Sequence, residues 1–262
     1  MLTLVSTPIG NLTDISNRAI ETLQTCDLIL CEDTRHSQKL LKAYDIDKPC
    51  LSYHQFNEKE RLPQLVAKLK EGQTLALISD AGTPGICDPG QHLIQMCHDE
   101  DIRVSAIPGP CAFTSAFALS GFDLPYQFLG FLPKKLGQRQ TALIKALCFD
   151  GSTAFYETPH QIHATLDLLH KLAPKRQICL VRELTKQFEE VRRGISSELA
   201  NVTAKGEFCL VIESKPLQYE GDLKSLVNEL IASFDLSPKE AIKIAAELGH
   251  FSKQQLYKDF HN

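Results

Sequence analysis

The chain has 262 residues, a formal net charge of -4 at pH 7, and 43% hydrophobic residues. This length is ample for two domains with buried cores. The acidic balance excludes a globally basic nucleic-acid binder, so RNA would have to meet a local basic face.

The cysteines and the apolar runs indicate where the protein works. Nine cysteines form an odd set without a CxxC pair or metal-ligand spacing, and Cys179 and Cys209 lie inside apolar runs. This usage predicts buried thiols in a reducing compartment and no metal site. The strand expected at 2–6 leaves no room for a signal peptide, and no apolar run is long enough to cross a bilayer. We therefore expect a cytoplasmic protein with no membrane partner.

Five short apolar runs in the first 120 residues are typical of strands, and each is followed by a helix of crossover length. The runs cover 2–6, 28–31, 51–53, 75–78 and 104–107, and the helices cover 16–23, the stretch around 40–41, 62–69, the stretch after 88, and 112–120. Because parallel strands need crossover connections, this alternation predicts a doubly wound parallel sheet in a domain of residues 1–120.

The loop after the fourth run, SDAGTPG at 79–85, is the centre of this domain. Its small side chains, Pro and Gly let the backbone approach a ligand closely. Asp88 is expected to cap the next helix, with Pro89 at its first position. Ligands of open α/β sheets bind at such strand-to-helix crossings, whereas a tight turn without a ligand is the alternative. Similar turns follow two other strands, at 7–12 and 108–111.

A second α/β run begins after a junction at 121–125. Strands are expected at 128–131, 154–157, 178–181 and 208–212, with a loosely alternating stretch at 187–193 and helices at 139–147 and 162–172. Two of these strands have no helix between them, so the second domain, 121–220, should hold a mixed sheet.

The remaining segment, 221–262, is predicted to be helical. An amphipathic helix covers 223–234, and capping boxes stand at 237–240 and 252–255. The pattern is typical either of a helix-turn-helix or of a small helical cap packed on the second domain. Lys239 and Lys243 are four residues apart on one helical face, so we also expect this segment to make an auxiliary RNA contact.

Nine segments in order from Val5 to Glu213 carry a family resemblance: VSTPIGNLTDIS, CEDTRHSQKLL, HQFNEKER, ISDAGTPGICDPG, IPGPCAFTSAF, GFLPKK, FYETPHQI, RELTKQFEEVRRG and GEFCLVIE. Together they resemble the 16S rRNA 2'-O-ribose cytidine methyltransferases of the tetrapyrrole-methylase superfamily. The resemblance implies a two-domain tetrapyrrole-methylase-like fold and methylation of a cytidine ribose in the decoding region of 16S rRNA, in the small ribosomal subunit. It also implies a homodimer, for which the Ala- and Ser-rich helix at 112–120 offers a close-packing surface.

The implied cofactor is S-adenosylmethionine, bound in a folded conformation between the two α/β domains. The cofactor positions carried over are Pro8, Asp80, Ala81, Gly82, Thr83, Ile86, Cys111, Ala112, Tyr156, Leu184 and Phe208. Asp80 would be the electrostatic partner of the cationic ligand, or would cap its own turn. Leu184 or Phe208 would give the adenine an apolar slot. Replacing Gly82 by Val is expected to lower cofactor affinity rather than fold stability.

Two positions depart from the wider superfamily. The first loop reads Thr7-Pro8-Ile9-Gly10-Asn11 where tetrapyrrole enzymes carry a GxGxGD-like form, and Ser79 stands where they have Gly. Both are forms of the rRNA branch. Methylation of a tetrapyrrole carbon remains an alternative, as does a ribosome-associated module that binds S-adenosylmethionine without transferring the methyl group.

Three residues are candidates around the ribose and phosphate of the substrate: Lys186 in RELTK, Arg35 in EDTRH and Asn57 in HQFNE. Lys186 could act as a base if burial or nearby cations lower its pKa. Otherwise it would bind phosphate, as Arg35 would. Salt bridges with Glu183 or Glu32 are the structural alternative.

Overall fold

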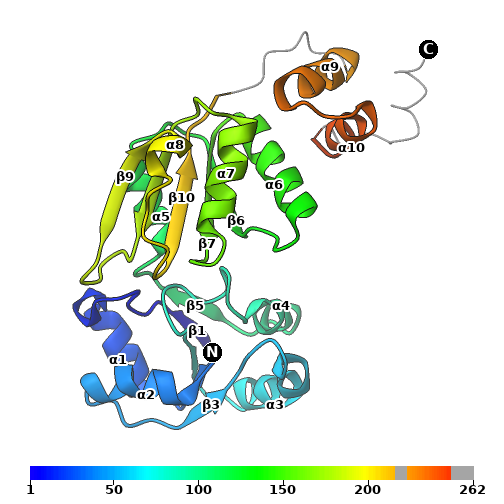
Figure 1. Cartoon of the computed structure of the whole chain (residues 1–262). Coiled ribbons are helices and arrows are strands. Elements are labelled where there is room, and N and C mark those ends of the chain that lie inside the picture. Colours follow the sequence, from blue (N-terminus) through cyan, green and yellow to red (C-terminus); the bar gives the residue numbers. More distant parts are fainter. Residues whose placement is uncertain (216–222, 249–262) are drawn as a thin grey trace. The chain divides into compact units, whose positions relative to one another are not determined.

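The computed structural model describes residues 1–215 and 223–248, and the chain divides into two compact units (Figure 1). The first unit holds Met1–Ser115 together with Leu184–Gln187. The second holds Ala116–Glu183 and the chain from Phe188 onward. Residues 184–187, which include the end of the RELTK segment, thus belong to the first unit although the chain on either side of them belongs to the second.

The first unit is built on a parallel sheet of five strands in the order β3-β2-β4-β1-β5. Its strands are β1 (Leu2–Val5), β2 (Leu28–Cys31), β3 (Cys50–Ser52), β4 (Leu75–Leu77) and β5 (Val104–Ile107). Its helices are the 3-10 turn η1 (Leu12–Asp14), α1 (Asn17–Thr25), α2 (Thr34–Ala43), α3 (Glu58–Lys70) and α4 (Gln91–Asp99). The predicted parallel sheet is confirmed.

The direction of the chain across this sheet explains why helices cover both faces. From β1 through β2 to β3 the chain moves toward one edge, and from β3 through β4 to β5 it moves back toward the other. Because parallel crossovers are right-handed, the reversal puts α1 and α2 on one face and α3 and α4 on the opposite face, as Figure 1 shows. The sheet is therefore doubly wound.

The side chains of β4 contribute to the hydrophobic cores on both faces of the first sheet. Ala76 belongs to the core under α1 and α2, whereas Leu75 and Leu77 belong to the core under α3 and α4. Successive strand residues point to opposite faces, so a strand buried on both sides must be apolar throughout.

The prediction that Asp88 caps α4 is wrong. The helix begins at Gln91, and its N-cap is Gly90, whose φ of 142° favours glycine. A Cβ at Gly90 would lie 2.7 Å from Cδ2 of Leu77, so close packing against β4 also requires glycine there. Asp88 is not used as a cap because its carboxyl group interacts with the side chains of Ser79 and Glu32 instead.

The second unit holds a mixed sheet in the order β6-β7-β10-β8-β9, as predicted. Its strands are β6 (Tyr126–Phe131), β7 (Ser152–Glu157), β8 (Ile178–Arg182), β9 (Glu190–Gly194) and β10 (Phe208–Ile212). Only the pairing of β6 with β7 is parallel; the other three pairings are antiparallel. The helices of this unit include α6 (Leu136–Cys148), α7 (Ile162–Leu172) and α8 (Ser196–Leu199), while α5 (Ala112–Ser120) begins in the first unit and continues into the second. Apolar side chains of α6 and α7 share one core cluster with Phe155 of β7 and Leu210 of β10.

Two described helices follow the second sheet, α9 (Leu223–Phe234) and α10 (Pro238–Leu248). The predicted capping box is confirmed, because Ser237 Oγ accepts from Glu240 N at 3.3 Å and Ser237 N donates to Glu240 Oε2 at 3.2 Å. Apolar residues of both helices belong to the core cluster of the second unit, and Lys145 of α6 forms an ion pair with Glu247. This part of the segment thus packs as a helical cap.

Lys239 and Lys243 are exposed on α10, so an RNA contact by this helix stays a prediction. The second predicted capping box, 252–255, and the turn at Gly249 lie outside the described residues.

Two predicted absences concern membranes and metals. Within 1–215 and 223–248, no helix has the length and apolar character needed to cross a bilayer. The same stretches contain no group of three or more metal-ligating side chains that could hold an ion.

Candidate functional site

The candidate site lies at the carboxyl edge of the first sheet, where the loops after β1 and β4 are joined backbone to backbone. Thr7 N donates to Gly82 O at 2.8 Å, and Gly82 N donates to Thr7 O at 3.0 Å. Gly82 adopts a φ of 87°, which L-residues rarely adopt, and this geometry lets its N–H and C=O both face Thr7. Glycine at this position is therefore a structural requirement of the loop pair.

Hydroxyl side chains extend this link to the loop after β5. Thr7 Oγ1 donates to Ser79 O at 3.1 Å, and Ser79 Oγ donates to Gly82 O at 3.0 Å. Thr83 Oγ1 donates to Pro110 O at 3.1 Å and lies 2.9 Å from Ser6 Oγ. The loops of three adjacent strands, β4, β1 and β5, are thus held together by short hydrogen bonds, which preorganises their backbone.

Asp80 lies in the middle of this edge. Its Oδ1 is buried and has no hydrogen-bond partner among the described residues, so this oxygen does not cap its own turn. Asp80 lines two cavities, a large one of about 540 Å³ and a small one of about 100 Å³. A buried carboxylate oxygen without a partner costs free energy, and a cationic ligand would satisfy it.

The large cavity is acidic. It is formed by the loops after β2, β3 and β4 and lined by Glu32, Asp33, His54, Gln55, Phe56, Glu58, Asp80, Ile86, Cys87, Asp88, Pro89, Gly90, Gln91 and His92. Five of these side chains are carboxylic acids. The strand order explains the gathering, because β2 and β4 are neighbours and both end at this edge.

Two of these carboxyl groups, Glu32 and Asp88, interact by a side-chain hydrogen bond. Burial raises the pKa of Glu32 to about 7, and the nearby charges of Asp88 and Asp80 contribute to this rise. Burial also raises the pKa of Asp88, while hydrogen bonds from Ser79 and Glu32 act in the opposite direction. Two close carboxyl groups with raised pKa values hold a proton between them near neutral pH.

The predicted cofactor positions of the first unit lie on the linked loops. Pro8 lines the small cavity with Asp80, and Ile86, which is 43% exposed, lines the large one. Ala81 is exposed, and Gly82 and Thr83 carry the backbone and hydroxyl hydrogen bonds that join the loops. The remaining positions of this unit are half-buried Cys111, half-buried Ala112 at the start of α5, and half-buried Leu184.

The segment around Leu184 packs against the first loop. A Cβ at Gly10 would lie 2.4 Å from Cγ of Lys186 and 3.2 Å from Leu184 O. Thr185, a β-branched residue, has a φ of 65°. Such strain persists only where surrounding contacts enforce it, and it often marks a functional loop.

The two predicted positions of the second unit, Tyr156 and Phe208, lie on neighbouring strands. In the register of β10 and β7, Cys209 pairs with Tyr156 and Phe208 pairs with Glu157. The side chains of Tyr156 and Phe208 therefore point to opposite faces of the sheet. Phe208 is 3% exposed and belongs to the core with Phe155 and Leu210, whereas Tyr156 is half-buried and contacts the ring of Phe128.

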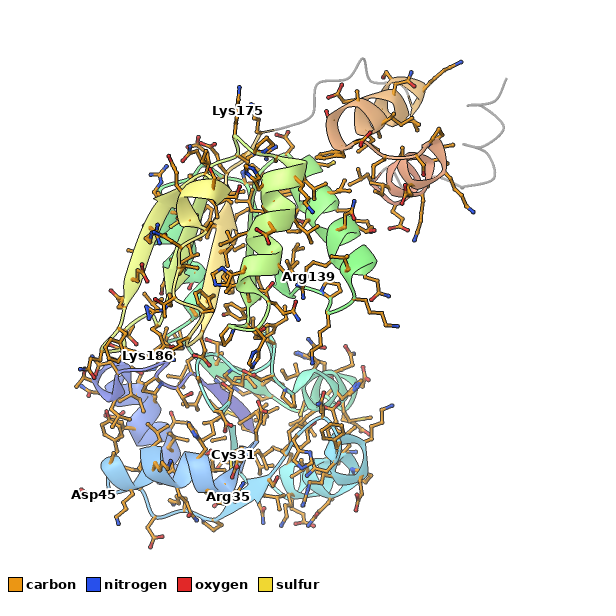
Figure 2. All side chains as sticks on the ribbon, viewed as in Figure 1. Cys31, Arg35, Asp45, Arg139, Lys175 and Lys186 are labelled. Carbon is orange, nitrogen blue, oxygen red and sulfur yellow. The ribbon has the colours of Figure 1, made fainter. Side chains whose placement is uncertain are left out.

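The three predicted catalytic candidates have different surroundings. Arg35, on α2, forms a bidentate pair with Asp33 at 2.8 and 3.1 Å, and its side chain is 88% exposed (Figure 2). Asn57 is engaged within its own loop, accepting from His54 N at 2.8 Å and donating to Ser52 O at 3.1 Å. Lys186 packs against Gly10 in the first unit. Arg35 and Asn57 thus order the loops that carry them, whereas the stem of Lys186 helps to seat the RELTK segment on the first loop.

The sequence analysis missed Glu32, Asp88, His54 and Phe56 as lining residues of one cavity. A usable signal existed for the two carboxyl groups, because Glu32 directly follows the run 28–31 and Asp88 lies in the loop after 75–78. Their proximity depends on β2 and β4 being neighbours, and this order follows from the fold rather than from the spacing.

A parallel doubly wound unit with preorganised loops at its carboxyl edge, followed by a mixed-sheet unit, defines a two-part α/β protein that binds a small ligand at strand ends. The family model described as tetrapyrrole (corrin/porphyrin) methylases matches residues 1–200, and the chain belongs to this family.

Curated relatives match along the whole chain. "Ribosomal RNA small subunit methyltransferase I" of Synechocystis sp. is 43% identical over 269 residues, covering 98% of this chain and 96% of that protein. The protein of the same name from Haemophilus influenzae is 43% identical over 272 residues, covering 98% and 95%. That of Streptococcus pyogenes serotype M1 is 40% identical over 272 residues, covering 100% and 94%.

Solved structures show the same fold at low identity. Diphthine synthase matches with a TM-score of 0.62 and 13% identity, over 96% of this chain and 99% of that one. Uroporphyrin-III-C-methyltransferase from Thermus thermophilus matches with a TM-score of 0.57 and 16% identity, over 81% and 93%. These likenesses support the predicted two-domain tetrapyrrole-methylase-like fold.

The predicted cofactor, S-adenosylmethionine, is the methyl donor of this family. The residues present fit such a group. The donor is a cation, and Oδ1 of Asp80, on the loop that is joined to Thr7, is buried without a hydrogen-bond partner among the described residues. When bound, the cofactor supplies an electrophilic methyl group, and the loops would hold and orient it.

Any side chain at Gly82 should lower stability as well as cofactor affinity, whereas the sequence analysis expected Gly82→Val to lower affinity alone. Gly82→Ala is the smallest change that tests this. An L-residue at a φ of 87° costs about 1 to 2 kcal/mol. The added Cβ would also lie 3.3 Å from Cγ2 of Ile9 and disturb the Thr7 link. Gly72→Ala is the matched control, since Gly72 has a φ of 91° and nothing within 4 Å of its Cβ position. Denaturant unfolding should show a loss of stability in both variants, with the larger loss in Gly82→Ala, and calorimetry should show weaker cofactor binding only in Gly82→Ala. Equal cofactor affinity in the two variants would contradict this assignment.

Stability should fall as pH rises from about 4.5 to about 7, because the folded protein holds a proton on Glu32 that the unfolded chain releases at its ordinary pKa of 4.5. Glu32→Gln removes this titrating group, so its unfolding free energy should depend less on pH across that window. The exposed Glu60 on α3 provides the control variant, Glu60→Gln. Urea unfolding at pH 5 and pH 8 is the measurement. A pH slope in Glu32→Gln as steep as in the parent protein would show that Glu32 does not hold this proton.

Proposed function

We propose that the protein transfers the methyl group of S-adenosylmethionine to the 2'-hydroxyl of a cytidine ribose in the decoding region of 16S rRNA, with the small ribosomal subunit as its partner. The observation that carries the proposal is the set of full-length relatives at 40 to 43% identity named "Ribosomal RNA small subunit methyltransferase I". Methylation of ribosomal RNA is the general activity that these names support. The ribose position, the cytidine and the decoding region come from the resemblance of motifs such as SDAGTPG and RELTK.

The geometry of the first unit supports a methyl transfer that depends mainly on positioning. The linked loops hold the proposed cofactor residues Asp80, Gly82 and Thr83 rigidly, and the acidic cavity lies directly beside them because Asp80 lines its wall. Holding two reactants in line can contribute roughly 7 to 11 kcal/mol to lowering the barrier. A cavity that adjoins the donor site therefore offers a place for the acceptor.

Within this proposal, Lys186 and Arg35 are phosphate contacts outside the acidic cavity, and neither residue lines it. Asn57 orders the loop that carries His54, by the hydrogen bonds to His54 N and Ser52 O. The predicted homodimer stays a prediction that sedimentation at micromolar concentration would test. Its support is the group of exposed apolar side chains in the second unit, Leu119, Tyr126, Leu129 and Phe131.

Tetrapyrrole methylation is the second candidate, favoured by the family description. The solved methyltransferase structures that match are 16% identical or less and show the fold alone. The third candidate is a ribosome-associated module that binds the cofactor without transfer.

The deciding experiment uses S-adenosylmethionine with a labelled methyl group. The protein is incubated separately with assembled small subunits, naked 16S rRNA and a precorrin. We expect label in one of the RNA samples, in a cytidine nucleotide whose 3' phosphodiester resists alkali, because 2'-O-methylation removes the hydroxyl that attacks the phosphate. Label in the precorrin would favour the second candidate, and label in none of the samples would favour the third. Label in an alkali-sensitive nucleotide would show rRNA methylation away from the ribose.

A further inference from the structure

The acidic cavity combines features that a solvated charged surface does not need. Phe56 lines it and is 87% exposed, and its ring contacts that of His54 edge-on at 6.0 Å between centroids. A large aromatic side chain left almost fully exposed at the border of a cavity is a platform on which a planar group can stack. Ile86, also exposed, adds apolar surface to the same lining.

The charge of the cavity limits what can enter. Glu32, Asp33, Glu58, Asp80 and Asp88 line it, and its described lining contains no Lys or Arg. A phosphate group would be repelled by these carboxylates, whereas an uncharged nucleoside would not. The volume of about 540 Å³ lies within the range of about 300 to 1,000 Å³ that small-molecule sites occupy.

Two buried polar atoms of the lining are left without a hydrogen-bond partner by the described part of the protein. His54 Nδ1 and Asp80 Oδ1 are buried and have no hydrogen-bond partner among the described residues, and both side chains line the cavity. They belong to loops after different strands, β3 and β4. Polar groups in such positions are normally satisfied by a ligand or by water.

The Glu32 and Asp88 carboxyl groups lie on the same lining, in hydrogen-bond contact with each other. Enzymes that act on one nucleotide take it out of the stack and hold its base against aromatic or apolar side chains. A hydroxyl group is a weak nucleophile, so a carboxylate within reach of it can accept its proton as the new bond forms.

We propose that this cavity takes up one unstacked nucleoside of the acceptor RNA, with its base on Phe56, and that the Glu32 and Asp88 pair accepts the proton of its 2'-hydroxyl. The inference rests on the proposed function and adds the acceptor pocket and the proton acceptor to it. The hydroxyl oxygen forms a bond to the methyl carbon while the bond from that carbon to sulfur breaks, and the electron pair stays on sulfur. The proton moves to a carboxylate oxygen of the pair and then to water.

The titration of the pair sets the expected pH dependence. The other titratable groups lining the cavity are Asp33, Asp80, His54, Glu58, Cys87 and His92, and Asp33 is paired with Arg35 while Glu58 lies 3.4 Å from His92. Because burial raises the pKa of Glu32 to about 7, the proton acceptor is available above this pH and blocked below it. The methylation rate should therefore rise with pH through about 7.

The first test compares Glu32→Gln with the parent protein and with Glu60→Gln, which changes an exposed carboxylate on α3 outside the cavity. We expect kcat to fall by about 10² to 10⁴-fold in Glu32→Gln, with unchanged cofactor and RNA affinity and without the rise near pH 7. Asp88→Asn should behave similarly, and Glu60→Gln should match the parent. A readout independent of turnover is the titration of the labelled Glu32 carboxyl carbon by NMR in the free protein, which should show a midpoint near 7.

The second test addresses the stacking residue. Phe56→Leu keeps an apolar side chain but removes the aromatic face, so RNA binding should weaken by about tenfold, while Phe56→Tyr should restore it. Cofactor affinity and unfolding free energy should not change, because the side chain is almost fully exposed.

The outcomes separate the inference from the proposed function. No ribose methylation by the parent protein would overturn the proposed function itself. Ribose methylation with an unaltered rate and pH profile in both Glu32→Gln and Asp88→Asn would overturn the proton acceptor. Loss of cofactor binding in Glu32→Gln, with RNA binding intact, would show that the cavity holds the cofactor instead of the nucleoside. Equal RNA affinity of Phe56→Leu and the parent protein would show that Phe56 does not belong to the acceptor pocket.

Discussion

The backbone link between Thr7 and Gly82 is the constraint on which the candidate site depends. It joins the loops after β1 and β4, and the hydroxyl groups of Ser6, Ser79 and Thr83 extend it to the loop after β5. Loop backbone that makes its hydrogen bonds within the protein loses little conformational entropy when a ligand binds. The cofactor residues are thus held in place by the ends of a buried parallel sheet, which is among the most rigid parts of an α/β unit.

Charge is the second organising feature. A cavity with five carboxyl groups repels phosphate, Asp80 at its wall attracts a cationic methyl donor, and burial with neighbouring charges raises the pKa of Glu32 and Asp88. Each effect follows from the neighbouring positions of β2 and β4, which bring Glu32 close to Asp88 and Asp80. An RNA substrate can therefore place an uncharged part in this cavity while its backbone phosphates stay outside.

Much of the fold could be predicted from the sequence, because buried parallel strands leave uninterrupted apolar runs. The run at 28–31 coincides with β2, and 104–107 coincides with β5. The start of α4 could not be predicted correctly, because Asp88 and Pro89 form a typical helix-start pattern whereas the actual N-cap depends on the φ of Gly90 and its contact with Leu77. Local signals fail where a tertiary contact decides the backbone conformation.

The site was predicted only in part, for a similar reason. The loop at 79–85 is visible in the sequence because its small residues are contiguous. The pairing of Glu32 with Asp88 depends on strand order, and the separation of Tyr156 from Phe208 depends on the register of β7 and β10. Neither can be derived from spacing along the chain, and the division of the chain into segments 1–120, 121–220 and 221–262 stays a prediction.

The central claim is that the carboxyl edge of the first unit binds the methyl donor, with Asp80 as its charged partner. Calorimetric titration of S-adenosylmethionine into Asp80→Asn tests it most directly, with Asp45→Asn as a control in the exposed turn after α2 (Figure 2). Loss of a charged contact should weaken binding by about tenfold or more in Asp80→Asn, since hydrogen bonds to charged groups contribute about 1.5 to 3 kcal/mol, and Asp45→Asn should bind like the parent. Parent-like affinity in a folded Asp80→Asn protein would contradict the account.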